Sequence, residues 1–77
     1  MKITNVWITP EAQYMYLEKD GKIYKVALVP YRKLKDADLK EMKSPMSNED
    51  IILHAHGKKP TESFLVGLKF YGLELAE

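Results

Sequence analysis

Ala12 to Val29 reads AQYMYLEKDGKIYKVALV, in which two runs rich in β-branched and aromatic residues meet at Asp20-Gly21. An Asp-Gly pair between alternating apolar residues is the strongest short-range signal for a β-hairpin, since both central residues of a type I′ turn need positive φ angles. We therefore predict an antiparallel hairpin with a two-residue turn at Asp20-Gly21.

The two-residue turn sets Lys19 opposite Lys22, and this pair fixes the register of all the others. The side chains predicted to face the core are Met15, Leu17, Tyr24, Val26 and Leu28, with Gln13 opposite Leu28 at the open end. The other face carries Tyr14, Tyr16, Glu18, Ile23, Lys25 and Ala27. Because this second face mixes aromatic and charged groups, we expect it to be half-exposed or covered by an amphipathic element.

The chain has 77 residues, which is enough for one domain with a thin core. Its 45% hydrophobic and 30% charged residues argue against intrinsic disorder, and a net charge of +1 gives no overall attraction to nucleic acid or anionic lipid. The absence of cysteine excludes disulfides and fits a reducing compartment, so we expect a cytoplasmic protein. No apolar run is as long as the core of a secretory signal or as a membrane-spanning helix, and we expect no membrane partner.

The N-terminal segment Lys2 to Ile8 is predicted to be a first strand, closed by a turn at Thr9-Pro10-Glu11. With the hairpin it forms a three-stranded antiparallel meander whose last strand is ended by Pro30. Three strands with one apolar face need a cover, and the second half of the chain must supply it.

Two short helices are predicted in that half. The first runs from Ala37 to Lys43, with Asp36 as N-cap and a stop at Ser44-Pro45. The second runs from Asn48 to His56 after the capping residue Ser47, with Gly57 as the glycine that follows the helix. A strand through residues 51–53 is the alternative to the second helix.

Ser63 to Leu75 (SFLVGLKFYGLEL) fits two patterns. A helix would gather Phe64, Leu65, Leu68 and Tyr71 on one face, and a strand would alternate Phe64, Val66, Leu68 and Phe70. Gly67 and Gly72 would each cost a helix interior about 1 kcal/mol, so we predict a strand. The expected fold is α+β, a small antiparallel sheet of three to four strands covered by one or two short helices.

Both ends of the chain resemble a small uncharacterised bacterial family, the domain-of-unknown-function 2442 family. The matching residues are Met1-Lys2-Ile3, then Glu18-Lys19-Asp20-Gly21 through Val26 to Pro30, and finally Lys69 to Glu77. The family's Trp-Pro-Asn before the last glycine and its final proline are missing, and the middle from Arg32 to Ser63 matches only in placing a helix before the last strand. The resemblance implies an α+β fold, a strand at Phe64 to Phe70, and accessory proteins with no known enzymatic activity, some encoded near toxin and antitoxin genes.

No set of residues predicts catalysis or a cofactor. His54 and His56 would point to opposite sides of a helix and have no third ligand nearby in sequence. The carboxylate pairs Asp36/Asp38 and Glu49/Asp50 lie in charged runs where nothing would raise a pKa. The sequence contains no nucleophile elbow, dinucleotide-binding motif or P-loop, so we expect no enzyme, no metal, no cofactor and no small-molecule substrate.

We therefore expect a non-enzymatic interaction or regulatory module that binds another protein or itself through the sheet face or edge. The alternative is single-stranded nucleic-acid binding, with bases stacked on the Tyr14/Tyr16/Lys25 face and phosphates held by the basic stretch Arg32 to Lys43. The predicted interaction surface consists of Tyr14, Tyr16, Ile23, Lys25, Arg32 and Lys33.

Overall fold

The computed structural model describes residues 1–29 and 31–76, and Pro30 and Glu77 lie outside this description. The described part forms a four-stranded antiparallel sheet in the order β2-β3-β4-β5, a two-stranded parallel sheet of β1 and β6, and two α-helices. The strands are β1 (Lys2–Ile3), β2 (Asn5–Ile8), β3 (Tyr14–Lys19), β4 (Lys22–Ala27), β5 (Lys40–Glu41) and β6 (Glu74–Leu75). The helices are α1 (Asn48–His54) and α2 (Glu62–Gly67), with 3-10 turns η1 (Asp36–Asp38) and η2 (Leu68–Tyr71). The predicted α+β class is confirmed.

The hairpin of β3 and β4 has the predicted register along its whole length. Lys19 lies opposite Lys22, Leu17 opposite Tyr24 and Met15 opposite Val26. The φ angles of Asp20 and Gly21 are 53° and 76°, as a type I′ turn requires. At the open end Leu28 donates a backbone hydrogen bond to Gln13, at 3.0 Å, so the pairing continues beyond the strands. The prediction that Pro30 ends this strand falls outside the described residues.

The predicted first strand is interrupted at Thr4. Ile3 and Val6 are both buried in the same core, and a single regular strand cannot place residues three apart on one face. At Thr4 the alternation of side chains between the two faces is shifted by one residue. The Thr4 amide and hydroxyl both donate to the carbonyl of Glu18. β2 then pairs with β3 as expected, whereas β1 leaves the meander and pairs in parallel with β6.

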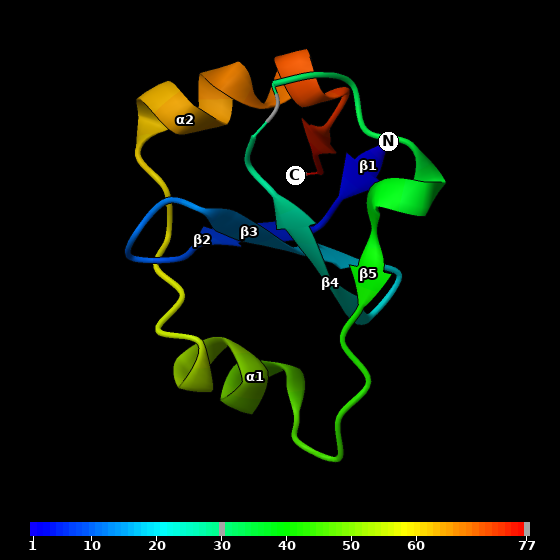
Figure 1. The fold of residues 1–77 in the computed structure, drawn as a ribbon, viewed down its shortest axis with the longest axis vertical. Coiled ribbons are helices and arrows are strands. Elements are labelled where there is room, and N and C mark those ends of the chain that lie inside the picture. Colours follow the sequence, from blue (N-terminus) through cyan, green and yellow to red (C-terminus); the bar gives the residue numbers. More distant parts are fainter. Residues whose placement is uncertain (30, 77) are drawn as a thin grey trace.

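The sheet is covered on both faces, with α2 on one side and α1 on the opposite side (Figure 1). The wider core, on the α2 side, consists of the buried residues Ile3, Val6, Met15, Leu17, Val26, Leu28, Leu68, Tyr71 and Leu73. The smaller α1-side cluster consists of Tyr16, Ile23, Ile51 and Ile52, with Trp7, Met42 and Ala55 packed against it. Neither helix, among the residues described, is long and apolar enough to cross a membrane.

The predicted helix from Ala37 to Lys43 is wrong. Asp36 lies inside η1 instead of capping a helix, and the chain continues as the edge strand β5 beside β4. The reason is the separation of the apolar residues, since Leu39 packs against the wider core and Met42 against the α1-side cluster. Side chains that must reach opposite faces of a sheet suit a strand and not a helix with a single apolar stripe.

The predicted second helix is confirmed as α1. The Ser47 hydroxyl accepts a hydrogen bond from the backbone amide of Asp50, at 3.2 Å, so Ser47 caps the helix as expected. Its C-terminal end differs from the prediction, because the left-handed residue is His56, with φ 55°, and not Gly57. Gly57 instead donates to Ile52, and His56 donates to Leu53, which together form a Schellman motif.

The predicted strand at Phe64 to Phe70 is also wrong, since this segment forms α2 and η2. Thr61 caps α2 by accepting a hydrogen bond from the amide of Phe64, and Gly72 ends η2 with φ 76°. Leu68 and Tyr71 are buried while Val66 and Phe70 are exposed. This is the burial pattern expected if the segment forms a helix, the alternative that the sequence also allowed. The fourth strand of the main sheet is therefore β5, and the C-terminal strand is the short β6.

Candidate interaction surface

The predicted interaction surface is divided by α1. Tyr16 is 5% exposed and Ile23 is 1% exposed, because both lie in the cluster that α1 covers. These two residues are not available to a partner, and their place in the predicted surface is corrected. The amphipathic cover that the sequence allowed for this face is α1 itself.

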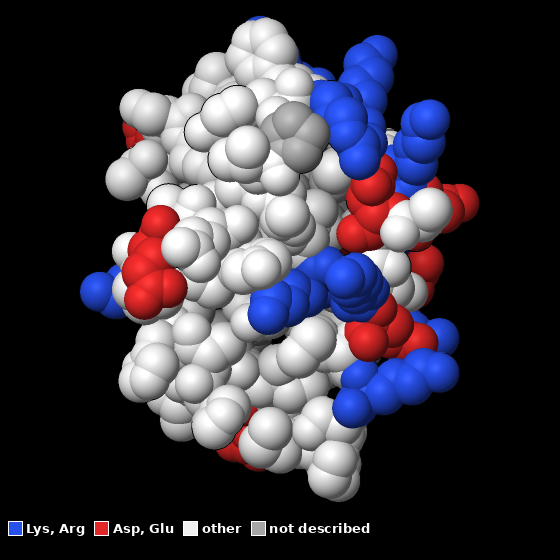
Figure 2. Space-filling model, in the orientation of Figure 1, with Lys and Arg blue, Asp and Glu red and all other residues white. Residues whose placement is uncertain are grey.

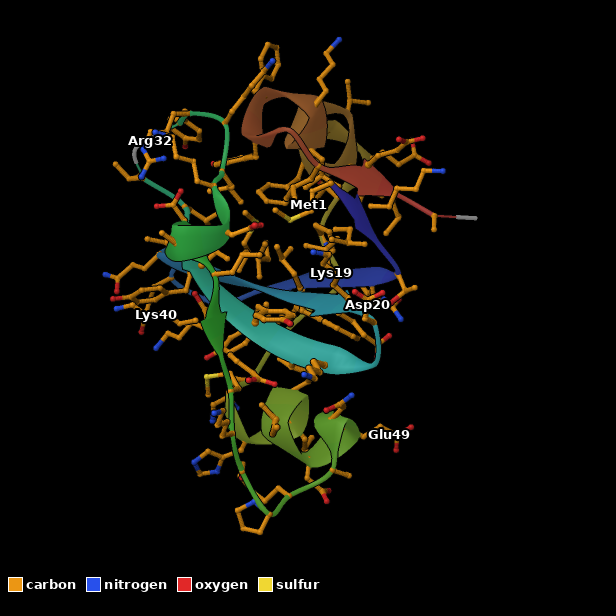
Figure 3. All side chains as sticks on the ribbon, turned by 90° about the vertical axis from the view of Figure 1, so that its right-hand side faces the viewer. Met1, Lys19, Asp20, Arg32, Lys40 and Glu49 are labelled. Atoms are coloured by element: carbon orange, nitrogen blue, oxygen red, sulfur yellow. The ribbon has the colours of Figure 1, made fainter. Side chains whose placement is uncertain are left out.

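Tyr14 and Lys25 lie at the end of the same sheet face that α1 leaves open. The Lys25 ammonium lies 4.2 Å from the centre of the Tyr14 ring, a cation–π contact. Lys40 is the cross-strand neighbour of Lys25, and Figure 3 shows Lys40 and Arg32 at the end of the sheet away from Asp20. A hollow of about 330 Å³ lies here, and its lining is Tyr14, Lys25, Ala27, Ala37, Asp38 and Lys40.

Arg32 is exposed but already paired. Its guanidinium donates two hydrogen bonds to the Asp38 carboxylate, at 2.9 and 2.7 Å, and Asp38 also accepts from the Lys35 amide. The Arg32 hydrogen bonds, followed by that of Lys35, hold the pKa of Asp38 at about 2, below its ordinary 3.8, and the same pairing raises the pKa of Arg32. Arg32 therefore acts first as a clamp on its own loop, and Lys33 beside it is exposed.

A hollow of about 500 Å³ lies between α1 and the sheet, and three of its polar side chains, Asn5, Glu18 and Asn48, are joined by hydrogen bonds. Glu18 accepts from the side chains of Asn5, Thr4 and Asn48, and these hydrogen bonds, that of Asn5 first, lower the pKa of its carboxyl. Lys59 donates to Asn5 at 2.7 Å, and its ammonium lies 4.5 Å from the centre of the Trp7 ring. This network attaches α1 and the segment after it to the sheet, which is a structural role.

A third hollow, of about 460 Å³, is lined mainly by apolar groups, and we call it the aromatic hollow. It lies between the β2–β3 turn, the end of the β3–β4 hairpin and the α2–η2 segment, and its lining is Ala12, Leu28, Tyr31, Ser63, Phe64, Gly67, Phe70 and Tyr71. The Tyr71 hydroxyl donates to the carbonyl of Leu28 at 2.8 Å, and burial raises its pKa. The floor is therefore fixed, because Tyr71 is tied to the hairpin through this bond.

The rim of the aromatic hollow carries large apolar groups that no described residue covers. Tyr31 is 76% exposed and Phe70 is 64% exposed, and Val29 and Val66, two residues before Tyr31 and four before Phe70, are 66% and 67% exposed. None of the described lining residues is charged, and the Lys69 ammonium lies 5.5 Å from the centre of the Phe70 ring. In Figure 2 the charged side chains gather on the right of the molecule, whereas the upper left, over α2, is almost free of them.

The residues considered for metal binding and acid–base chemistry remain apart. His54 and His56 are both exposed, at the end of α1 and just beyond it. Within residues 1–29 and 31–76, no three His, Asp or Glu side chains come together as a metal site. Glu49 and Asp50 lie in the first turn of α1, where Asp50 accepts from the Ser47 hydroxyl, and Figure 3 shows Glu49 pointing away from the molecule.

The aromatic hollow was not predicted from the sequence, because it depends on the conformation of the C-terminal segment. In the predicted strand, Phe64 and Phe70 would share one face and Tyr71 would take the other. The helical pattern instead buries Tyr71 and leaves Val66 and Phe70 outside. The signal was therefore in the sequence, as the helical alternative and as the capping residue Thr61 before it.

Comparison with protein-family models, with curated proteins and with solved structures found no match to this chain. The resemblance of its two ends to the domain-of-unknown-function 2442 family stays a prediction, and the strand that it implied at Phe64 to Phe70 is replaced by α2 and η2.

Proposed function

We propose that this chain is a non-enzymatic interaction module that binds another protein, or a second copy of itself, through the aromatic hollow. The observation that carries the proposal is the exposure of Tyr31 and Phe70 beside a concave apolar site. Exposed apolar patches next to a groove are typical of binding sites, and aromatic residues are enriched in the centres of interfaces. A cytoplasmic location, expected from the absence of cysteine, is part of the same proposal.

The route of binding differs from the one that the sequence suggested. Both faces of the main sheet are covered except for the end at Tyr14 and Lys25, and the edges of the sheet are short or partly occupied. β5 has two residues, and β2 exchanges two backbone hydrogen bonds with Lys58 through Ile8. A partner strand would therefore find little free edge, whereas the aromatic hollow is open to the solvent.

The proposal can be tested with Nile red, a neutral dye whose emission rises in apolar surroundings, added to dilute protein. We expect the emission to rise with the wild-type chain and to fall by most of this increase in Phe70→Ser. Leu53→Ser is the matched control, because Leu53 is 76% exposed on α1, on the opposite side of the sheet. If Phe70→Ser bound the dye as well as the wild type, the aromatic hollow would not be the binding site.

Single-stranded nucleic acid remains the second candidate, favoured by the Lys25–Lys40 pair beside Tyr14. Two lysines directly opposite each other on one face repel, and a phosphate between them would relieve that repulsion. Fewer residues are available for nucleic-acid binding than the sequence suggested, because Tyr16 is buried and the Tyr14 ring is already in contact with Lys25. Titration with single-stranded oligonucleotides at two salt concentrations tests this function: binding should weaken steeply with salt and be lost in Lys25→Glu.

A further inference from the structure

The aromatic hollow and its exposed rings lie together, and this juxtaposition points to a particular partner. Tyr31 and Phe70 line the hollow and also project from its rim, with 76% and 64% of their surfaces exposed. A two-fold interface needs a patch that is complementary to itself, with protrusions and a depression on the same surface. We propose that the partner of the aromatic hollow is a second copy of this chain, with Phe70 of each copy and the outer face of Tyr31, whose ring centre lies 5.8 Å from that of Tyr71, packing against the hollow of the other. This inference rests on the proposed function and names its partner.

The charges favour this occupant. When a surface meets its own copy, a patch that carries charges of a single sign repels itself, whereas a neutral patch does not. The described lining of the aromatic hollow carries no charged side chain, and Lys69 lies near the rim, where solvent screens it. The net charge of +1 adds little repulsion between two copies. A charged partner would find nothing complementary in this lining.

The size of the chain favours the same occupant. A stable interface buries about 800 Å² on each partner, which is roughly a seventh of the 5470 Å² that the described chain exposes. A small domain has few other ways to cover rings as exposed as those of Tyr31 and Phe70, and a second copy seated on the hollow would cover both. Aromatic side chains bury large areas with little loss of conformational freedom, so these rings would supply most of the affinity.

The test is sedimentation equilibrium of the full chain from micromolar to millimolar concentration. We expect a monomer–dimer equilibrium whose dissociation constant rises about thirtyfold in Phe70→Ala and by a similar factor in Tyr31→Ala. Leu53→Ala, which removes an equally exposed apolar side chain from α1, should leave the constant unchanged. Circular dichroism and thermal melting of each variant establish that all of them fold, as the exposure of these side chains predicts.

A second measurement locates the interface directly. In ¹H–¹⁵N spectra of the wild-type chain, dilution should shift the amide signals of the residues that line the aromatic hollow and leave those of α1 in place. A dimer weakened by Leu53→Ala and not by Phe70→Ala would overturn the inference, because the two copies would then meet through α1.

The outcomes separate this inference from the proposed function. A wild-type chain that stays monomeric at every concentration, yet binds Nile red in a manner that depends on Phe70, overturns the second copy and leaves the binding module intact. A monomer that does not bind the dye overturns both. A dimer that depends on Tyr31 and Phe70, with dye binding that increases on dilution, supports both.

Discussion

The two faces of the main sheet are covered to different extents. The α2-side core joins buried residues from β1, β2, β3, β4, η2 and the segments between them, and Ile3, Met15 and Leu17 within it are fully enclosed. The α1-side cluster depends on one seven-residue helix, whose two isoleucines pack on Tyr16 and Ile23. The first core is built from segments far apart in the sequence, whereas the second is a single element laid on a face that is half polar.

The two sides also differ in what lies beside each cluster. On the α1 side the polar groups are bonded to one another, through Glu18, Asn5 and Lys59, and the space beneath the helix belongs to the fold. On the α2 side the buried surface of η2 closes the core while its outer surface presents Phe70 beside the aromatic hollow. The more extensively buried of the two layers is therefore the one beside the proposed binding site, and this packing would hold that site in place.

The largest expected effect compares one deletion in each cluster. Leu17→Ala should lower the free energy of unfolding by about 4 kcal/mol, because Leu17 is 1% exposed and enclosed by several elements. Ile52→Ala should cost about 2 kcal/mol, because Ile52 is 8% exposed and α1 can settle onto the vacated space. Urea unfolding measures both values. An equal or larger loss in Ile52→Ala would show that α1 is as essential as the wider core.

The next prediction compares one substitution at two glycines. A Cβ at Gly57 would lie 3.0 Å from Ile52 Cγ2 and 3.3 Å from Trp7 Cβ, so Gly57→Ala should cost about 1 to 2 kcal/mol by pushing the chain after α1 away from the sheet. Gly67, in α2, has nothing within 4 Å, and Gly67→Ala should stabilise the protein by about 0.5 to 1 kcal/mol through helix propensity. Thermal melting of the two variants should give shifts of opposite sign. A shift of the same sign in both would contradict this contrast.

The sequence predicted the parts of the fold that depend on local rules. The hairpin register followed from Asp20-Gly21, and α1 followed from Ser47, because a turn and a cap each act within a few residues. The break at Thr4 was not predicted, since it arises from the pairing of β1 with the distant β6. The low helix propensity of Gly67 led to the wrong prediction of a strand. The burial of Leu68 and Tyr71 outweighs the penalty of glycine in a helix, and α2 forms instead.

The candidate site was harder to predict than the fold. Tyr14, Tyr16, Ile23 and Lys25 were placed correctly on one face by the hairpin, but which part of that face stays open depends on where α1 lies. The aromatic hollow joins Ala12 and Leu28 to the helical segment from Ser63 to Tyr71, so its existence required the tertiary arrangement. The exposed Phe70 was visible only through the helical pattern that the prediction set aside.

A smaller effect is expected at the end of α1. His56 has φ 55°, a left-handed conformation that glycine adopts without strain, so His56→Gly should stabilise the protein by about 0.5 to 1 kcal/mol. His54, in the last turn of the same helix, is the matched control, and His54→Gly should destabilise by a few tenths of a kcal/mol. Chemical denaturation of both variants checks the signs. A loss of stability in His56→Gly would mean that the imidazole contributes more to α1 than the strain removes.

The smallest effect concerns the clamp between Arg32 and Asp38, which closes the loop that carries Leu34 and Leu39 onto the wider core. The pKa of Asp38 is about 2 in the folded chain, below its ordinary 3.8, so its ionised form is the one that folding favours. A carboxyl with a depressed pKa contributes stability that is complete above its unfolded pKa and is lost as the pH falls through the folded value. The clamp should therefore weaken between about pH 4 and pH 2.

Asp38→Asn tests this expectation. The variant should be slightly less stable than the wild type at neutral pH, because exposed ion pairs contribute little, and the difference should shrink as the pH falls from about 4 to 2. Arg32→Gln should give the same pH profile, since it removes the other partner of the same bonds. Urea unfolding at several pH values measures the profile. If the difference stayed constant down to pH 2, the loop would be held by Leu34 and Leu39 alone, and the wider core would need no electrostatic support at its edge.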